Sequence, residues 1–461
     1  MRNVYIPMSY IFRRRLSAPI NDLTRAIRDE IYIAPYSSYN FAEHRNTIAK
    51  GDMYNPHTTL LDALNWIVTQ YEKYCVPTRF SDAAVKRVWE LICNEDHNTD
   101  FLCVGPVNNV IHLLAVYYHE GKGSYRYNRH VERLADFMWV GREGMMMNGT
   151  NGVQLWDTAF TVAAAFEADL AGDKEFIPCL TKALEFLDDM QVSPPLPPHN
   201  FLLHEIPENA PKEAYRHQRK GAWPFSTRHQ GYTVSDCTAE GLRAVLLLQS
   251  HPSYPNLIPA SRLESAVNVL LSLQNPNGGF ASYELCRAGD WMEWINPAEV
   301  FGRIMVEYCY PECTTAVITA LALFRRDFPG YRRGEIDRAV ERACKWVHSD
   351  QRADGSWYGS WGICFTYAAS FAMECLACVG EEYENSDAQY RACEFLVGKQ
   401  NEDGGWGESF ESCEFGVYTE NPEGSQVVNT AWALLGLMYA KYPRKEVLRQ
   451  GIQVRYVGAW I

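Results

Sequence analysis

The sequence predicts an all-α protein whose main part is an α/α-toroid, a ring of helical hairpins, joined to a partial second α/α-barrel lobe. Three observations carry this prediction. Nearly apolar helical segments recur along the chain, amphipathic helical segments alternate with them, and similar glutamine-to-aromatic turns follow the amphipathic segments. Helices buried on both sides are apolar nearly all round, whereas helices with a solvated face are amphipathic. The alternation therefore indicates an inner and an outer layer.

The inner layer is expected to consist of segments that open with a Thr-Ala step or a close variant. The copies are WDTAF from Trp156, DCTAE from Asp236, ECTTA from Glu312, CFTYA from Cys364 and VNTAW from Val428. Apolar helices that face one another favour closure into a ring over an open solenoid. A six-hairpin ring needs one more inner helix, which is not found before the end of the chain at RQGIQVRYVGAWI. We therefore expect an incomplete ring.

The outer layer is expected to consist of amphipathic helices. In EIDRAVERACKWV, apolar residues from Ile336 to Val347 recur at helical spacing, with charged residues on the opposite face. Each outer helix ends in a polar, glycine-containing turn that runs from Gln274 to Phe280, from Gln351 to Trp357 and from Gln400 to Trp406. A degenerate copy ends at Gln191. We interpret these turns as stitches between outer helices, with the glutamine capping a helix and stacking on the aromatic ring.

The N-terminal part has helical patterns without such turns, in LTRAIRDEIYI, TLLDALNWIVTQYEKYC and NNVIHLLAVYYHEG. We predict a partial α/α-barrel lobe over residues 1–147 and the toroid, expected to be catalytic, over residues 148–461. The Pro-rich stretch SPPLPPHNFLLHEIPENAP, from Ser193, is expected to be an external loop within the second lobe.

Composition excludes several classes of function. The net charge is -13 and no extended Lys/Arg stripe is present, which excludes a nucleic-acid partner. The sequence contains no run of 18 or more apolar residues, which is the length needed to span a bilayer. A helix lying in the membrane interface remains an alternative. Fourteen cysteines without a recognisable secretory signal indicate a reducing compartment.

The segment VSDCTAEG places an acid and a thiol in the first turn of a buried helix. Ser235 is expected to cap this helix, and Asp236 is favoured there by the helix dipole, so capping alone is one interpretation. In a ring, however, the first turns of all inner helices converge on one mouth. That mouth would gather Trp156, Asp236, Cys237, Cys313, Trp361, Phe365 and Tyr367, with Phe225, Tyr283 and Phe301 just upstream.

Such a mouth suits carbocation chemistry. A buried aspartic acid keeps its proton because desolvation disfavours the carboxylate. Aromatic faces stabilise a cation without a lone pair that would quench it, and exclusion of water protects the intermediate. No DDxxD run is present to chelate magnesium. We therefore expect neither a metal nor another cofactor.

The motif DCTAE at residues 236–240, together with the repeated turns, resembles the oxidosqualene cyclases of the terpene cyclase/mutase family. Further segments also resemble this family, namely MRNVYIPMSY, GTNGVQLWDTAF, NPAEVFGRIM, YPECTTA, GSWGICFTY and GGWGESFESC. The resemblance covers essentially the whole chain. It implies that (3S)-2,3-oxidosqualene is cyclised to a triterpenol of the lanosterol or protostadienol type.

The resemblance assigns Asp236 as the acid that protonates the epoxide, with the thiols of Cys237 and Cys313 hydrogen-bonded to it. DCTAE in place of the DxDD of squalene–hopene cyclases implies an epoxide substrate, which needs a weaker acid than an alkene does. We expect Glu240 to be a structural hydrogen-bonding partner and not a second acid.

The resemblance also assigns the walls of the cavity. Trp156, Phe225 and Trp361 match aromatic residues that stabilise the ring cations. Tyr283 is similar to a residue near the middle rings, and Phe301 to another wall residue.

The surroundings of the enzyme follow from the same resemblance. Tyr5 and Ile304 match the constriction of a channel through which substrate arrives from the membrane. The family implies monotopic attachment to the endoplasmic reticulum membrane or a lipid droplet on the cytosolic side. We expect a monomer or a weak homodimer.

Alternatives from other classes remain. Family members are longer at both ends, so we expect an open toroid with a solvent-accessible cavity. One alternative is a truncated, inactive cyclase or a pseudoenzyme that binds sterol precursors. Another is the β subunit of a protein prenyltransferase, which holds zinc with Asp, Cys and His. DCTAE offers Asp236 and Cys237 for zinc, but no suitably placed histidine is evident.

Overall fold

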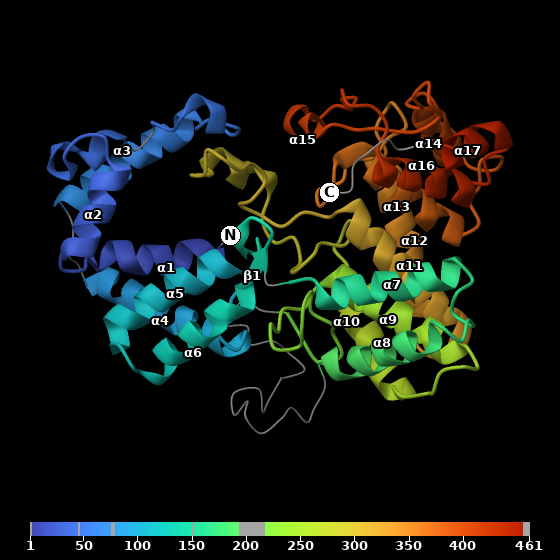
Figure 1. Ribbon diagram of the computed structural model, residues 1–461, viewed down its shortest axis with the longest axis horizontal. Coiled ribbons are helices and arrows are strands. Elements are labelled where there is room, and N and C mark those ends of the chain that lie inside the picture. Colours follow the sequence, from blue (N-terminus) through green and yellow to red (C-terminus); the bar gives the residue numbers. More distant parts are fainter. Residues whose placement is uncertain (1, 45–46, 75–78, 150–151, 193–216, 455–461) are drawn as a thin grey trace. The chain divides into compact units, whose positions relative to one another are not determined.

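The computed structural model describes residues 2–44, 47–74, 79–149, 152–192 and 217–454. These form two compact units (Figure 1). The first unit comprises Met1–Asn151 with Ala288–Val306, and the second comprises Gly152–Arg287 with Glu307–Ile461. The sequence had placed residues 288–306 in the second lobe, whereas they pack with the first unit. The Pro-rich stretch from Ser193 lies outside the described residues.

The first unit is helical except for one hairpin. Its elements are α1 (Arg2–Arg13), α2 (Asp22–Ile31), α3 (Thr59–Tyr74), α4 (Arg79–Asn98), α5 (Pro106–Glu120), α6 (Tyr125–Arg133), β1 (Met138–Gly141) and β2 (Gly144–Met147). The three helices predicted in this region are confirmed as α2, α3 and α5. The antiparallel β1–β2 pair was not predicted. Helix α1 packs against α4 and α5, around a core that includes Tyr10, Ile92 and Ala115.

Local signals explain where these helices begin and end. At the start of α2, the Asn21 side chain accepts a hydrogen bond from the Thr24 amide, and the Thr24 hydroxyl oxygen accepts one from the Asn21 amide. This reciprocal capping box satisfies two amides that lack partners within the helix. Helix α5 begins with Pro106 after Gly105 and ends at Glu120, and it is followed by Gly121, whose φ of 93° favours glycine.

The second unit has the predicted two-layer order. The inner helices are α7 (Gln154–Glu167), α9 (Ser235–Ser250), α11 (Pro311–Asp327), α13 (Cys364–Cys378) and α16 (Val427–Tyr439). Each inner helix packs against the next in chain order (Figure 1). The outer helices are α8 (Ile177–Met190), α10 (Ala260–Ser272), α12 (Arg333–Asp350), α14 (Asp387–Val397) and α17 (Lys445–Ile452). The prediction of an all-α fold is confirmed.

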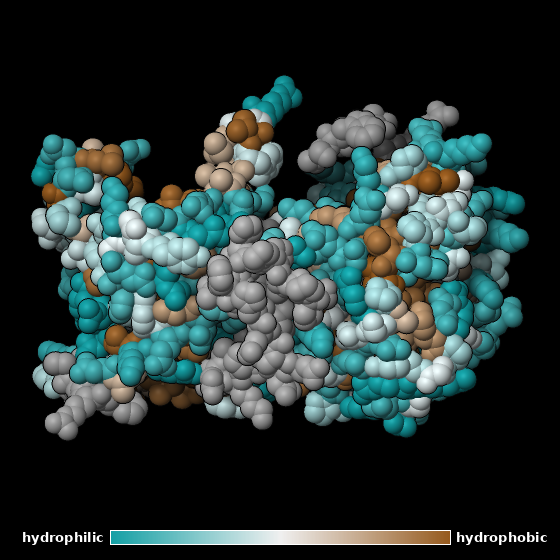
Figure 2. Space-filling model, turned by 90° about the horizontal axis from the view of Figure 1, so that it is seen from below, coloured by the Kyte–Doolittle hydropathy of each residue, from teal (hydrophilic) through white to brown (hydrophobic). Residues whose placement is uncertain are grey.

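Burial separates the two layers as their sequence patterns predict. In α9, every residue from Ser235 to Leu242 is buried, so this helix has protein on all sides. In α12, only one face is buried, and it includes Ile336, Ala343 and Val347. Hydrophilic residues cover most of the second unit on the face shown in Figure 2, with a smaller apolar patch among them.

The glutamine-containing turns join neighbouring outer helices, as predicted. After α10, the Gln274 side-chain amide donates to the carbonyl of Gly278 in its own turn (3.0 Å) and to that of Ala339 on α12 (2.8 Å). Gln351 and Gln400 make equivalent pairs of hydrogen bonds. Gln191 also makes such a pair, so the copy predicted as degenerate is functional as a stitch. The glutamine thus acts by bridging two backbone carbonyls.

Glycine is required where each turn meets the next helix. Gly278 has a φ of +98°, and a Cβ atom there would lie 2.3 Å from the carbonyl oxygen of Arg342 on α12. Both the backbone conformation and the close approach of α12 exclude a larger residue. This contact fixes the spacing between α10 and α12, and thereby the spacing of the inner helices that they cover.

Candidate active site

Helix α9 begins at a buried junction. Its N-cap is Val234, which makes no side-chain cap, so the prediction that Ser235 caps the helix is wrong. The Ser235 hydroxyl instead donates to the carbonyl of Ala281 (2.6 Å), and its amide donates to that of Ser282 (2.8 Å). Because the hydrogen-bond partners of Ser235 lie in another segment, they could not be recognised from the local sequence. These bonds hold the first turn of α9 against the residues that precede Tyr283.

The acid and both thiols of the prediction lie together in the second unit. Asp236 is 6% exposed. Its Oδ1 accepts a hydrogen bond from the Cys237 amide (2.8 Å), and its Oδ2 accepts one from the Cys313 thiol on α11 (3.4 Å). The Cys313 sulfur also lies 3.3 Å from the Ser282 hydroxyl. The neighbouring first turns of α9 and α11 therefore orient one carboxyl group.

Burial sets the acidity of this group. It raises the pKa of Asp236 above its ordinary value, and the hydrogen bonds from the Cys237 amide and the Cys313 thiol offset only part of that rise. Burial likewise raises the pKa values of both thiols, so Cys237 and Cys313 are neutral hydrogen-bond donors. The direction of these shifts favours a protonated carboxyl group with an oriented proton.

A second acid near Asp236 was missed by the sequence analysis. Glu312, in the first turn of α11, is 1% exposed, and burial raises its pKa to about 7. Its Oε1 accepts hydrogen bonds from the amides of Ser360 (2.7 Å) and Trp361 (3.1 Å). A signal was present, because ECTTA places Glu312 where DCTAE places Asp236. Glu312 thus positions the segment that leads into α13.

Glu240 lies one turn further along α9 from Asp236. It is 2% exposed, and burial raises its pKa to about 7. Within the described part of the chain, its Oε2 accepts no hydrogen bond, and the nearest guanidinium nitrogen of Arg243 is 3.9 Å away. The expected hydrogen-bonding role is therefore not seen at this oxygen.

Aromatic side chains surround the first turns of the inner helices. In the first turn of α7, the Trp156 ring stacks on Phe225, with ring centroids 5.7 Å apart. The Tyr283 ring packs edge-on against Tyr232 at 5.8 Å. On α13, the Tyr367 ring lies 4.9 Å from Trp432 of α16.

Two of these aromatic residues are close to the acid. Burial raises the pKa of both the Tyr283 and Tyr367 phenols, and a negative charge on Asp236 would raise them further. The two phenols are therefore neutral. Tyr283 belongs to the segment before α11, and Tyr367 belongs to α13.

The other two predicted aromatic residues of this region differ in their surroundings. Trp361 is 57% exposed, and its ring lies 5.7 Å from Tyr310. Phe365 is buried against Phe395 of outer helix α14, among other rings. Residues two apart on a helix point about 200° apart. Because the Tyr367 ring packs against Trp432 of inner helix α16, Phe365 is turned toward the outer layer, and the structure does not bring it to the acid.

Three predicted site residues belong to the first unit. Tyr5 is half-buried on α1, and burial raises its pKa. Phe301 is 60% exposed, and its carbonyl accepts a hydrogen bond from the Asn296 side chain (2.7 Å). Ile304 is half-buried in the same segment.

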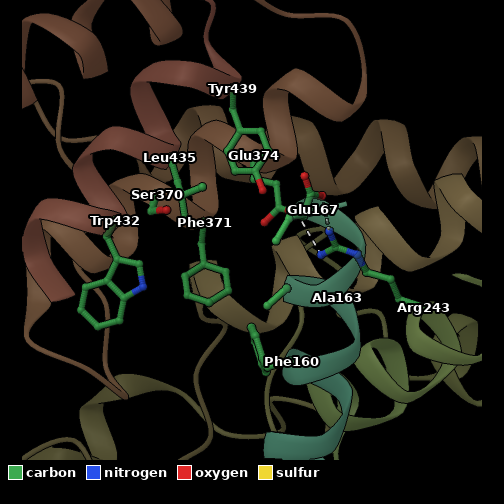
Figure 3. A pocket seen from close by; sticks show the side chains of 12 residues that line it. Phe160, Ala163, Glu167, Arg243, Ser370, Phe371, Glu374, Trp432, Leu435 and Tyr439 are labelled. Atoms are coloured by element: carbon green, nitrogen blue, oxygen red, sulfur yellow. Dashed lines mark ion pairs between the residues drawn. The ribbon is translucent and has the colours of Figure 1, made fainter. Parts of the chain in front are cut away.

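A cavity of about 390 Å³ lies among the inner helices α7, α9, α13 and α16 (Figure 3). It follows the aromatic mouth, because Phe160 contacts Trp156 and Trp432 contacts Tyr367. Apolar side chains line one part of it, including Phe160, Phe371, Trp432 and Leu435.

The other part of the cavity is polar. Arg243 forms an ion pair with Glu374 (2.9 Å) and lies 3.7 Å from Glu167. The Tyr439 side chain completes this end (Figure 3). The sequence analysis missed this group, although single charged residues within nearly apolar helices were a signal for it.

Comparisons with known proteins show which family this chain is similar to. The Squalene-hopene cyclase C-terminal domain matches residues 153–458. Lanosterol synthase of Pneumocystis carinii is 53% identical over 98% of this chain and 61% of that protein. Lanosterol synthase of Homo sapiens is 42% identical over 98% of this chain and 60% of that protein. This chain thus spans about three fifths of the length of these relatives.

Among solved structures, ent-copalyl diphosphate synthase from Streptomyces platensis aligns with 76% of this chain and 50% of that chain, at 14% identity and a TM-score of 0.44. The domain match covers nearly all of the second unit and more than half of the chain. The chain belongs to the squalene–hopene and oxidosqualene cyclases of the terpene cyclase/mutase family.

Proposed function

We propose that this chain carries the acid-initiated site of an oxidosqualene cyclase. Its substrate would be (3S)-2,3-oxidosqualene, and its product a cyclic triterpenol of the lanosterol or protostadienol type. The names of the relatives support this choice. The observation that carries the proposal is the buried carboxyl group of Asp236, held by the thiol of Cys313 beside aromatic rings. Lanosterol synthase relatives give no comparable support to the prenyltransferase alternative.

The proposed reaction begins with transfer of the Asp236 proton to the epoxide oxygen. The carbon–oxygen bond then breaks with both electrons on oxygen, and π electrons of successive double bonds form the ring bonds. The final cation loses a proton to a base, and Asp236 regains a proton from solvent, so substrate and product are isomers. The raised pKa of Asp236 keeps its proton available. The Cys237 amide and the Cys313 thiol stabilise the carboxylate that remains.

The aromatic residues would stabilise the cations that follow. The faces of Trp156, Phe225 and Tyr283 attract positive charge without donating a lone pair. Tyr367 is neutral and buried, and it would act in the same way.

Four further residues keep their predicted roles as part of this proposal. We assign Trp361 and Phe301 to the walls of the substrate cavity. Tyr5 and Ile304 are assigned to the constriction of the substrate channel.

The substrate is a hydrocarbon chain, so we propose that the protein is monotopic on the endoplasmic reticulum membrane or a lipid droplet, on the cytosolic side. Among the described residues, no helix is long and apolar enough to cross a membrane. Support comes from α3, where Leu60, Leu64, Ile67, Tyr71 and Tyr74 form one exposed stripe at helical spacing. A helix of this kind lies in the membrane interface with its apolar stripe toward the acyl chains.

The experiment is to express the chain in yeast that lacks its own oxidosqualene cyclase and to measure triterpenols by mass spectrometry. Wild type is expected to consume 2,3-oxidosqualene, and Asp236→Asn to lose product by at least about 1000-fold, since the initiating proton is gone. Asp387→Asn, at an exposed position on α14, is the matched control. Normal product from the Asp236 variant would rule out this acid. Substrate binding by wild type without turnover would instead support the non-catalytic alternative.

A further inference from the structure

A buried group of potential metal ligands lies in the first unit, which contains neither Asp236 nor its thiol partners. It consists of Asp96 on α4, Cys103 in the following loop and His130 on α6. All three side chains are fully buried. One ligand atom of each, an oxygen, a sulfur and a nitrogen, lies within 4.8 Å of the other two.

The second observation is that His130 lacks hydrogen-bond partners. Its Nε2 lies 3.2 Å from Asp96 Oδ1, but without the geometry of a hydrogen bond. Within the described residues, neither ring nitrogen of His130 makes a hydrogen bond. The ring is held in place by Phe101, which packs at 90° with centroids 5.2 Å apart. Buried polar groups in native proteins are almost always satisfied, so an unsatisfied imidazole points to a bound species.

We propose that Asp96, Cys103 and His130 bind one divalent transition-metal ion of the Zn²⁺ class. Carboxylate oxygen, thiolate sulfur and imidazole nitrogen are the ligand types that zinc uses. Zinc–ligand bonds place the ligand atoms of a tetrahedral site roughly 3.3–3.8 Å apart. The present separations, up to 4.8 Å, therefore need to contract by about 1.5 Å at most. A water molecule would take the fourth position, and Cys103 would release its proton to solvent.

The surroundings of the group support a fixed carboxylate. His112, on α5, places its Nδ1 2.7 Å from Asp96 Oδ1. Such hydrogen bonds to ligating carboxylates orient them toward the metal. The amide of Cys103 donates to the Thr99 hydroxyl (2.9 Å), which fixes the loop that carries the sulfur.

Charge near the group is close to balanced. Arg126 lies 3.5 Å from Asp96 Oδ2, and its guanidinium is paired with Glu120 at 3.2 Å. The two positive charges of the ion would be matched by the Asp96 carboxylate and the Cys103 thiolate. The ion would then link α4 and α6, which is a structural role independent of the proposed cyclisation.

Cobalt(II) is the probe for this proposal, because thiolate ligation gives a charge-transfer band in the near ultraviolet. The full chain is stripped with a chelator and titrated with Co²⁺, and Zn²⁺ is then added in competition. We expect one equivalent of cobalt, a thiolate band and its loss on addition of zinc. Cys103→Ser should lose the band, whereas Cys393→Ser, at a buried cysteine of the second unit, should keep it.

Two histidine variants separate ligation from positioning. His130→Gln should abolish stoichiometric binding, and His112→Asn should weaken it about 10- to 100-fold. Circular dichroism shows whether each variant is folded. The wild-type titration needs no variant, so a folded wild-type chain that binds no cobalt, or binds it without a thiolate band, overturns the proposal. A band that persists in Cys103→Ser also overturns it.

Discussion

Replacement of Glu240 by glutamine tests how strongly burial controls the acids of the second unit. Glu240 is 2% exposed, and burial raises its pKa from 4.5 to about 7 despite the attraction of Arg243. Between pH 4.5 and about pH 7, Glu240 is therefore protonated in the folded protein but ionised in the unfolded chain. The stability that this proton contributes is fully present below pH 4.5 and is lost as the pH rises to about 7. A shift of this size corresponds to about 3 kcal/mol.

Glu240→Gln keeps the shape of the side chain but cannot ionise. We expect the variant to match wild type within about 1 kcal/mol near pH 4.5 and to be more stable by about 3 kcal/mol at pH 8. Urea unfolding followed by circular dichroism at pH 4.5, 6 and 8 measures the difference. The pKa of Glu312 is also raised to about 7, so the variant should keep part of the pH dependence of stability seen in wild type.

The control for this experiment is Glu402→Gln, at an exposed position. It should leave the pH dependence of stability unchanged. If the stability difference between Glu240→Gln and wild type is the same at pH 4.5 and pH 8, the burial argument for Glu240 is wrong.

Three further predictions each concern one residue and the contacts that it makes. Cys313→Ala removes one hydrogen bond to Asp236 and should slow cyclisation by about 2- to 10-fold in a steady-state assay, with no change in the circular dichroism spectrum; an unchanged rate would contradict this role. Gln351→Ala breaks two hydrogen bonds between outer helices and should lower the unfolding free energy by about 1–3 kcal/mol, read from urea midpoints. Gly278→Ala should cost more than about 2 kcal/mol, whereas Gly330→Ala, where a Cβ atom meets open space, should leave the melting temperature nearly unchanged; equal effects would refute the argument from close approach.

Much of the helical architecture could be predicted because its signals are local. The apolar inner segments and the amphipathic outer segments have different periodicities, and each became a helix of the expected layer. The repeat also aligned the first turns of α9 and α11, which predicted that Asp236 and Cys313 lie at the same end of the inner layer. The same alignment contained Glu312, but its burial was not evident from the motif.

The features that the sequence analysis predicted wrongly depend on the direction of a side chain or on partners that are distant in sequence. Phe365 and Tyr367 both lie in the first turn of α13, but their rings face different layers because they are two residues apart. Ser235 bonds to a segment 46 residues away, so its local pattern suggested a cap that does not form. Residues 288–306 pack with the first unit although they lie between helices of the second.

By itself the sequence determined the all-α class and the alternation of two helical layers, and it singled out Asp236, Cys237 and Cys313 as a group, which the structure brings together. Each of these features is indicated by hydrophobic periodicity or by a short motif, and none of them depends on the path of the rest of the chain. Only the tertiary structure decided which side chains face the acid, which acids have raised pKa values, and that Asp96, Cys103 and His130 meet. Burial and through-space distance are properties of the packed chain, because they arise from residues that are far apart in sequence.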